Sequence, residues 1–225
     1  MFKIRCSAIG QIMNNPRSKS EMLSKTTITY LETWQKERLY NRRKSFTSKY
    51  TDKGTQQESW AIDFLADQTN RFLAKNETHF NNEWITGTPD IVLSDTIIDI
   101  KCSWDPFTFP LFDSEPDKAY WWQLQGYMDI CDRERAELTY ILADHTDEQI
   151  DRECKTRSYQ RGMDGEITIE IYDEVRSELT YDDIPPHLRC KTFYFERDQK
   201  AIDAIHERVE VCREYIKTHL SHYEG

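Results

Sequence analysis

The chain has 225 residues, which is enough for one domain with a sizeable hydrophobic core. Charged residues make up 31% of it and aromatic residues 12%, a composition typical of globular proteins, and no apolar run approaches the roughly 20 residues of a membrane-spanning helix. The net charge of -10 argues against nonspecific binding of nucleic acid through a generally basic surface, although basic residues can still be concentrated locally.

Neither the N-terminus nor the cysteines indicate export. The first five residues lack the long apolar stretch of a signal peptide. The six cysteines are scattered and never have a C-x-x-C spacing, which argues against a zinc or iron–sulfur site and is typical of reduced thiols. We therefore expect a cytoplasmic protein.

The first part of the chain has helical apolar patterns. Residues 1–15 carry four apolar side chains at helical spacing until Pro16 breaks the pattern. Similar patterns predict helices over about 21–40 and 55–74. The basic and polar stretch 41–54 between them is expected to be a loop.

Later in the chain the periodicity alternates between extended and helical. Residues 105–117 contain three prolines and are expected to form a loop, which is followed by a helix over 118–132. A long final helix follows Asp198, a residue suited to cap it. Strands are predicted over about 83–93, 96–102, 137–143, 166–173 and 190–196.

The order of these elements predicts a mixed α/β (α+β) fold, with a central mixed β-sheet flanked by helices. We expect a single domain over residues 1–225, because no internal repeat or low-complexity tail divides it. Within that domain, the acidic and polar region 144–165 is expected to be an inserted helix or an irregular excursion.

Two carboxylates and a lysine lie on the two predicted strands that follow residue 80. Asp90 ends the sequence Gly-Thr-Pro-Asp, and Asp99-Ile100-Lys101 follows nine residues later. A hairpin of the two strands brings Asp90 close to Asp99, and such a pair suits a hard divalent cation. Lys101 projects from the same strand face as Asp99. A metal ion, a water nucleophile and a cation at one point are what phosphodiester hydrolysis requires.

Two further motifs flank this hairpin in the sequence. Glu58 lies in the segment that opens the predicted helix 55–74. Gln123 and Tyr127 are four residues apart on the helix predicted over 118–132, so both can point at the sheet. Each motif alone is common, since a D-x-K on a strand usually forms a surface salt bridge and Pro-Asp is usually a turn. Their occurrence together and in this order is the informative feature.

The whole set resembles the PD-(D/E)XK nuclease superfamily in its RecB-like branch, and most closely the group of lambda exonuclease and YqaJ-type viral recombinases. The resemblance extends to Ile4-Arg5-Cys6-Ser7, to Asn15-Pro16-Arg17-Ser18, and to the segment Glu-Arg-Asp-Gln-Lys at 196–200. It implies a restriction-endonuclease-like core. Region 144–190 matches poorly, so it is expected to be a family-variable insertion.

The resemblance also implies a metal centre. Asp90 and Asp99 would bind Mg²⁺, or Mn²⁺, as one or two ions per site, with the backbone carbonyl of Ile100 as a further ligand. Glu58 would approach the metal directly or through water. Asp99 stands where many members of the superfamily have Glu, and both residues are accepted there.

Three side chains would then support catalysis. By the same resemblance, Lys101 would orient the attacking water and stabilise charge on the transition-state phosphate. Gln123 would help to position this lysine or the water, and Tyr127 would support the site. The family binds a 5′-phosphate with an arginine and a serine of its N-terminal segment. Ser7 matches the serine, and the arginine is either Arg5 or Arg17. Alternatively, Ser7 caps the first helix.

The implied activity is a metal-dependent exonuclease that degrades one strand of linear double-stranded DNA from its 5′ end. Its products would be mononucleotides and a 3′ single-stranded tail for phage recombination, with a single-strand annealing protein as partner. The family forms ring-shaped trimers around DNA. Two alternatives are a structure-specific or restriction-like endonuclease of the same superfamily and a catalytically idle DNA- or protein-binding phage factor. The intact Asp90, Asp99 and Lys101 argue against the second.

Two other groups of residues have open interpretations. A basic cluster is either a solvated helix end and loop or a contact to the DNA backbone; its members are Lys36, Arg38, Arg42, Arg43, Lys44 and Lys49. Trp104, Trp121 and Trp122 lie near the motifs in the sequence. They either pack in the core, which we favour, or stack on an unpaired base.

Overall fold

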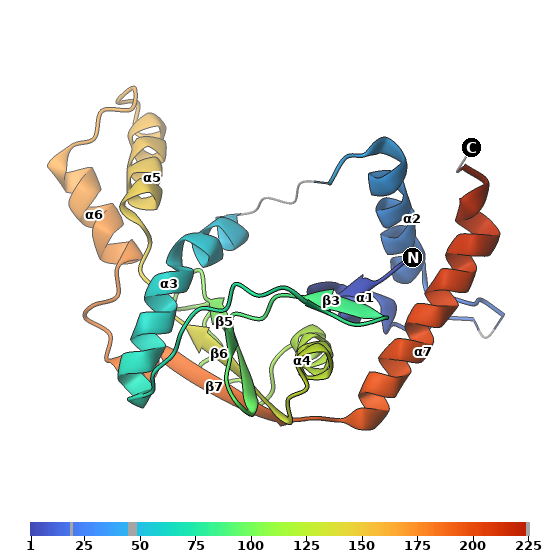
Figure 1. Cartoon of the computed structure of the whole chain (residues 1–225). Coiled ribbons are helices and arrows are strands. Elements are labelled where there is room, and N and C mark those ends of the chain that lie inside the picture. The colour runs from blue at the N-terminus through green and yellow to red at the C-terminus, as the bar shows by residue number, and fades with distance from the viewer. Residues whose placement is uncertain (19, 45–48, 224–225) are drawn as a thin grey trace.

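The computed structural model describes residues 1–18, 20–44 and 49–223. Figure 1 shows that strands lie at the centre of the molecule, with helices on both sides. The strands are β1 (Ile4–Arg5), β2 (Phe80–Asn81), β3 (Ile85–Gly87), β4 (Ile91–Val92), β5 (Thr96–Cys102), β6 (Arg135–Ile141) and β7 (Cys190–Glu196). The α-helices are α1 (Ile9–Ile12), α2 (Lys25–Tyr40), α3 (Lys49–Thr69), α4 (Lys118–Cys131), α5 (Asp147–Gln160), α6 (Ile169–Leu179) and α7 (Gln199–Tyr215). Short 3-10 or π-helical segments are η1 (Cys6–Ala8), η2 (Pro186–Leu188), η3 (Ile216–Leu220) and η4 (Ser221–Tyr223).

The strands of the described chain form two mixed sheets. The larger has the order β4-β5-β6-β7, in which β5 and β6 are parallel and the two outer pairs are antiparallel. The smaller has the order β1-β3-β2, with β1 parallel to β3. The three residues 88–90 connect β3 to β4 and so lead from one sheet into the other. The predicted mixed α/β fold is confirmed.

Alternate side chains of β5 enter different cores because successive strand residues face opposite sides of a sheet. Ile97 belongs to the core that contains Leu124 of α4, whereas Ile98 and Ile100 belong to the core that contains Leu65 of α3. Helices α4 and α3 therefore cover opposite faces of the larger sheet. By the same alternation, residues 99 and 101 share the face of β5 that α4 covers.

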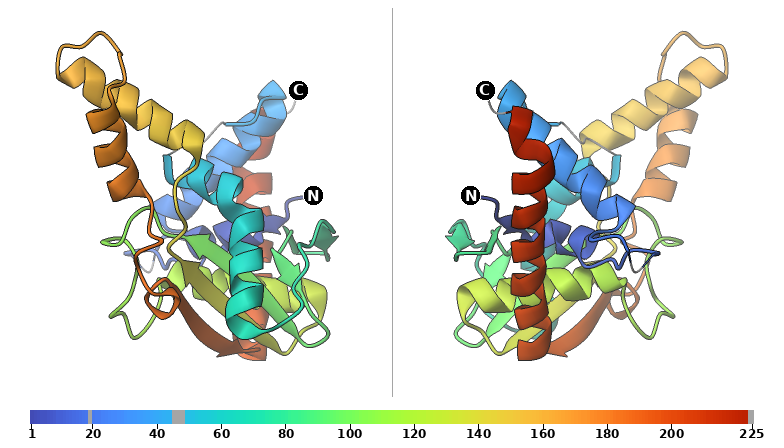
Figure 2. Two further views of the ribbon diagram at one scale, coloured as in Figure 1. Left: turned by 90° about the vertical axis from the view of Figure 1, so that its left-hand side faces the viewer. Right: turned by 90° about the vertical axis from the view of Figure 1, so that its right-hand side faces the viewer.

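Helices α5 and α6 form an arm that projects from the body of the molecule (Figure 2). They pack on each other through a small core of Ile150, Cys154, Ile171 and Val175. Arg157 ties the arm together through ion pairs with Glu153 and two glutamates of α6. The expected variable insertion covers this arm and remains a prediction. In the described residues, no helix has the length and apolar character needed to span a membrane.

Several predicted elements occur where the sequence placed them. Helices α2 and α4 agree with the predicted 21–40 and 118–132, and β7 coincides with 190–196. The side chain of Asp198 caps α7 by accepting bonds from two backbone N–H groups. The extended segment predicted at 83–93 is divided into β3 and β4.

Three predictions were wrong in type or extent. The predicted strand 166–173 is an irregular segment followed by the start of α6: Ile171 and Val175, four residues apart, are buried, and Thr168 caps the helix. The predicted loop 41–54 already contains the start of α3, although residues 45–48 lie outside the described residues. The helical pattern of 1–15 begins instead with β1, because that segment pairs with β3.

Candidate active site

The predicted hairpin brings Asp90 and Asp99 together. Strands β4 and β5 pair antiparallel with Ile91 opposite Ile98, which places Asp90, directly before β4, beside Asp99 of β5. The Ile100 N–H donates to Asp90 Oδ2 over 2.7 Å, and this bond fixes the Asp90 carboxylate against β5. Burial and the charge of Asp99 raise the pKa of Asp90 to about 7.

Asp99 and Lys101 project from the same face of β5, as the strand periodicity predicted. Lys101 Nζ lies 2.6 Å from Asp99 Oδ2, and Asp99 is only 1% exposed. Burial lowers the pKa of Lys101, but the carboxylates of Asp99 and Asp90 outweigh it and raise the pKa above its ordinary value. Lys101 also lies 5.1 Å from the centre of the Tyr120 ring, so this lysine is a charged group with a fixed position.

Gln123 and Tyr127 of α4 contact Asp99 and the segment that precedes Asp90. Gln123 Nε2 donates to Asp99 Oδ1 over 3.1 Å and to the Tyr127 hydroxyl over 3.2 Å. The Tyr127 hydroxyl donates in turn to the carbonyl of Thr88, two residues before Asp90. Burial and the nearby Asp99 charge raise the pKa of Tyr127, so this hydroxyl stays protonated and can donate. The predicted position of both side chains, pointing at the sheet, is confirmed.

Glu58 of α3 contacts a residue that the sequence did not indicate, and its charge adds slightly to the raised pKa of Asp90. Lys75 Nζ lies 2.9 Å from Glu58 Oε2. Its contact with Glu58, together with the charge of Asp90, raises the pKa of Lys75 despite a small opposing effect of burial. The neighbouring Asn76 donates its N–H to the Asp90 carbonyl over 2.7 Å and its side-chain amide to the Pro89 carbonyl over 2.9 Å.

These contacts mean that the segment before β2 holds the turn that carries Asp90. Lys75 and Asn76 act through an ion pair and through backbone carbonyls, which leave no regular spacing in the sequence. Before the structure is known, residues of this kind are indicated only by the general rule that backbone N–H and C=O groups near a site need hydrogen-bond partners.

The two aspartates have the charge and burial that fit a divalent cation. Two carboxylates held together without a cation repel each other, and this repulsion adds to burial, the larger cause, in raising the pKa of Asp90. Asp99 Oδ2 receives no well-aligned hydrogen bond from the described residues, although it pairs with Lys101. No three His, Cys, Asp or Glu side chains of the described chain converge on one point. A cation here would therefore rely on Asp90, Asp99 and a backbone oxygen such as that of Ile100.

The three residues considered for a 5′-phosphate lie in three different segments of the chain. Arg5 of β1 lies beside the Tyr30 phenol and lines a basic groove beside α2. Ser7 lies in η1 and is exposed, and neither η1 nor α1 uses it as a side-chain cap, so that alternative is wrong. Arg17 is exposed on the segment between α1 and α2. The assignment of a phosphate pocket to these residues remains a prediction.

The basic residues that lie close together in the sequence occupy different places in the structure. Arg43 and Lys44 line the same groove as Arg5, whereas Lys36 faces a hollow between α2 and the C-terminal helical turns. Arg38 lies over the Trp34 ring at 4.9 Å from its centre. The side chain of Lys49 is outside what the structure describes.

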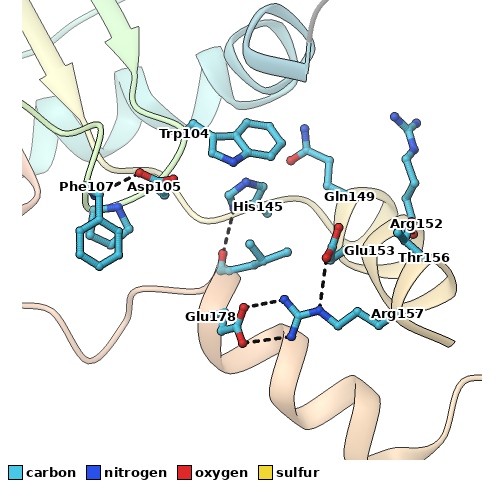
Figure 3. A pocket seen from close by; sticks show the side chains of 12 residues that line it. Trp104, Asp105, Phe107, His145, Gln149, Arg152, Glu153, Thr156, Arg157 and Glu178 are labelled. Carbon is cyan, nitrogen blue, oxygen red and sulfur yellow. Dashed lines mark hydrogen bonds and ion pairs between the residues drawn. The ribbon is translucent and has the colours of Figure 1, made fainter. Parts of the chain in front are cut away.

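Of the three tryptophans, Trp122 packs against the main core, as we favoured. Trp121 contacts it edge-on with ring centres 4.6 Å apart. Trp104 lines a separate hollow of about 660 Å³ between the loop after β5 and the arm (Figure 3). Its carbonyl accepts a 2.9 Å bond from the fully buried Lys53 of α3. Burial lowers the pKa of this lysine to about 8.

Comparison with solved structures places this architecture among exonucleases. A phage-related exonuclease from Haemophilus somnus 129PT superposes with a TM-score of 0.78 and 28% sequence identity, and the match covers 98% of this chain and 96% of that one. The alkaline exonuclease LHK-Exo from Laribacter hongkongensis superposes with a TM-score of 0.68 and 14% identity, over 99% and 91% of the two chains.

A second structure of LHK-Exo, in complex with dAMP, gives a TM-score of 0.65 at 16% identity over 99% and 90% of the chains. The sequence matches no protein-family model and no curated protein. Because the superpositions extend over nearly all of each chain, the likeness concerns the whole architecture as well as the hairpin. This chain has the fold of the phage-related and alkaline exonucleases.

Proposed function

We propose that the protein is a metal-dependent DNA exonuclease. The observation that carries this proposal is the arrangement of Asp90, Asp99 and Lys101, held by Gln123 and Tyr127 within a fold that superposes end to end on a phage-related exonuclease. The protein would hydrolyse one strand of linear double-stranded DNA, from 5′ to 3′, and leave a 3′ single-stranded tail. The dAMP complex of LHK-Exo supports a DNA substrate and mononucleotide products.

In this mechanism Asp90, Asp99 and the Ile100 carbonyl would hold Mg²⁺ or Mn²⁺. The bound ion supplies Lewis acidity toward the phosphate and lowers the pKa of the attacking water. Lys101, which is charged and fixed beside Asp99, would attract the scissile phosphate and stabilise its developing charge. Gln123 keeps Asp99 Oδ1 in place by donating to it, so the other oxygen stays directed at Lys101.

Glu58 would complete the site from α3. It is paired with Lys75 in this structure, and the charge of Asp90 also acts on Lys75. A phage recombination role, a trimeric assembly and a single-strand annealing protein as partner remain further parts of the proposal, and they rest on the resemblance of the motifs.

Two substrates separate an exonuclease from an endonuclease of the same superfamily. Purified protein is incubated with Mg²⁺ and either a covalently closed plasmid or the same plasmid linearised to bear a 5′-phosphate or a 5′-hydroxyl. We expect the linear form to lose its 5′-phosphorylated strand and the closed circle to persist. Cleavage of the circle would contradict the exonuclease assignment, and binding without any degradation would favour an idle DNA-binding protein.

A further inference from the structure

A groove beside α2 collects unpaired positive charge in an otherwise acidic protein. Two adjoining hollows of about 630 Å³ and 290 Å³ share Arg5, Tyr30 and Lys44 among their lining residues. The cations that line this basic groove are Lys3, Arg5, Lys25, Arg43 and Lys44. Glu37 is the acidic residue among its described lining, and its Oε1 already accepts a bond from the Lys44 N–H.

None of the five cations forms an ion pair with a carboxylate of the described chain. Lys3 contacts the amide oxygen of Asn81, and Arg5 contacts the Tyr30 phenol. This differs from the hollow at the arm (Figure 3), where Arg157 is bound by Glu153 and Glu178 and Asp105 adds a further negative charge. Clustered positive charge without carboxylate partners attracts anions, so the groove suits an anionic ligand.

The other polar groups of the groove suit phosphate oxygens better than bases. Thr26, Thr29 and Thr33 follow one another at helical spacing along α2 and all line the groove. Hydroxyl groups and cations are the usual donors to DNA phosphates. The aromatic residues of the groove are partly buried against the core, where the Phe2 ring contacts both Tyr30 and Trp34 edge-on. Base stacking is therefore not what this surface provides.

The backbone connects the groove directly to the candidate active site. Arg5 pairs with Thr86 of β3, and Thr86 also lines the groove. Asp90 follows Thr86 by four residues, so the Cα atoms of these two residues are at most about 14 Å apart. One DNA strand advances by roughly 3.4 Å per nucleotide along a duplex, so this separation corresponds to at most about four nucleotides.

We propose that the basic groove binds the phosphate backbone of duplex DNA a few nucleotides away from the bond being cut. This inference rests on the proposed function for the position of that bond, but the binding itself does not require cleavage. The contacts would be independent of sequence and of the chemical state of the DNA end, because they involve backbone phosphates alone.

The test measures binding separately from cleavage. All variants carry Lys101→Ala, so that DNA is not degraded, and fluorescence anisotropy follows binding of a short duplex between 50 and 300 mM salt. The groove variant is Arg5→Gln, Lys25→Gln and Lys44→Gln. A matched control removes three exposed lysines elsewhere, by Lys155→Gln, Lys200→Gln and Lys217→Gln.

We expect the groove variant to bind about tenfold more weakly or worse at low salt, with a salt-dependence slope smaller by about 2 to 3, since each lost phosphate contact removes about 0.9. The control variant should reduce neither the affinity nor the salt-dependence slope by a comparable amount. The loss should be equal for duplexes with a 5′-phosphate and with a 5′-hydroxyl. If Arg5→Gln impairs folding, Lys25→Gln with Lys44→Gln should lower the slope by about 2.

Three results would overturn the inference: equal effects of the groove and control variants, no DNA binding by the parent, or a loss confined to the 5′-phosphorylated duplex. The last would make the groove a pocket for the DNA end. Groove-dependent binding by a protein whose wild-type form degrades no DNA would contradict the proposed function and leave the inference standing.

Discussion

At the scale of single residues, the two aspartates and the lysine were foreseeable because each follows from local rules. A turn followed by two apolar runs predicts the hairpin, and strand alternation puts Asp99 and Lys101 on one face. Lys75 and Asn76 could not be found in this way. Their contacts to Glu58 and to the Pro89 and Asp90 carbonyls depend on how the segment after α3 returns to the hairpin.

The raised pKa of Asp90 predicts a pH-dependent stability of the metal-free protein. Its value of about 7 lies above the ordinary value of about 3.9, so its stabilising contribution is present below pH 4 and is lost as the pH rises through 7. In chelator, Asp90→Asn should therefore raise the free energy of unfolding at pH 8 by about 1 to 3 kcal/mol and change it little at pH 4.

Chemical denaturation at the two pH values measures this difference. Asp113→Asn, at an exposed position, is the control and should show no such dependence. An equal loss of stability at both pH values for Asp90→Asn would mean that the Ile100 N–H and Lys101 stabilise this carboxylate more than burial and the Asp99 charge destabilise it, and would contradict the prediction.

At the scale of elements, a helix or strand was predicted correctly where the tertiary contacts of the segment agreed with its local apolar pattern. The helix predicted over 118–132 is α4 (Lys118–Cys131), although its residues 123–128 are all buried rather than spaced along one face. Residues 166–173 were misread because isoleucines at 167, 169 and 171 alternate as in a strand, yet Ile169 is 72% exposed in α6. The burial of Ile171 beside Cys154 depends on the partner helix α5, which the local pattern does not contain.

Gly87 of β3 packs closely against η1 and α4, so we expect a substitution there to be destabilising. A Cβ at this position would lie 2.8 Å from Cys6 Sγ and 2.8 Å from Tyr127 Cε1. Gly87→Ala should therefore cost about 1 to 3 kcal/mol of stability and disturb the Tyr127 bond to Thr88. Thermal or denaturant unfolding measures the cost. Adding Cys6→Ala should recover part of it, and strict additivity of the two changes would argue against this close packing.

At the scale of the whole molecule, charge distribution carries more information than net charge. The chain has a net charge of -10, yet five cations without carboxylate partners in the described structure meet beside α2. They come from β1, the start of α2 and the segment after it, so composition alone could not bring them together. The mixed α/β fold itself followed from the order of elements, and it is shared with exonucleases along nearly the full chain.

The most direct measurement of the central claim compares the wild-type protein with Lys101→Ala on a linear duplex that carries 5′-phosphates, with Mg²⁺ and with chelator. The account predicts metal-dependent release of mononucleotides by the wild type. It predicts a loss of about a hundredfold or more in the variant, because Lys101 is the charged group fixed beside Asp99 where a phosphate would develop charge. Equal rates for a folded variant and the wild type, or undiminished activity in chelator, would contradict it.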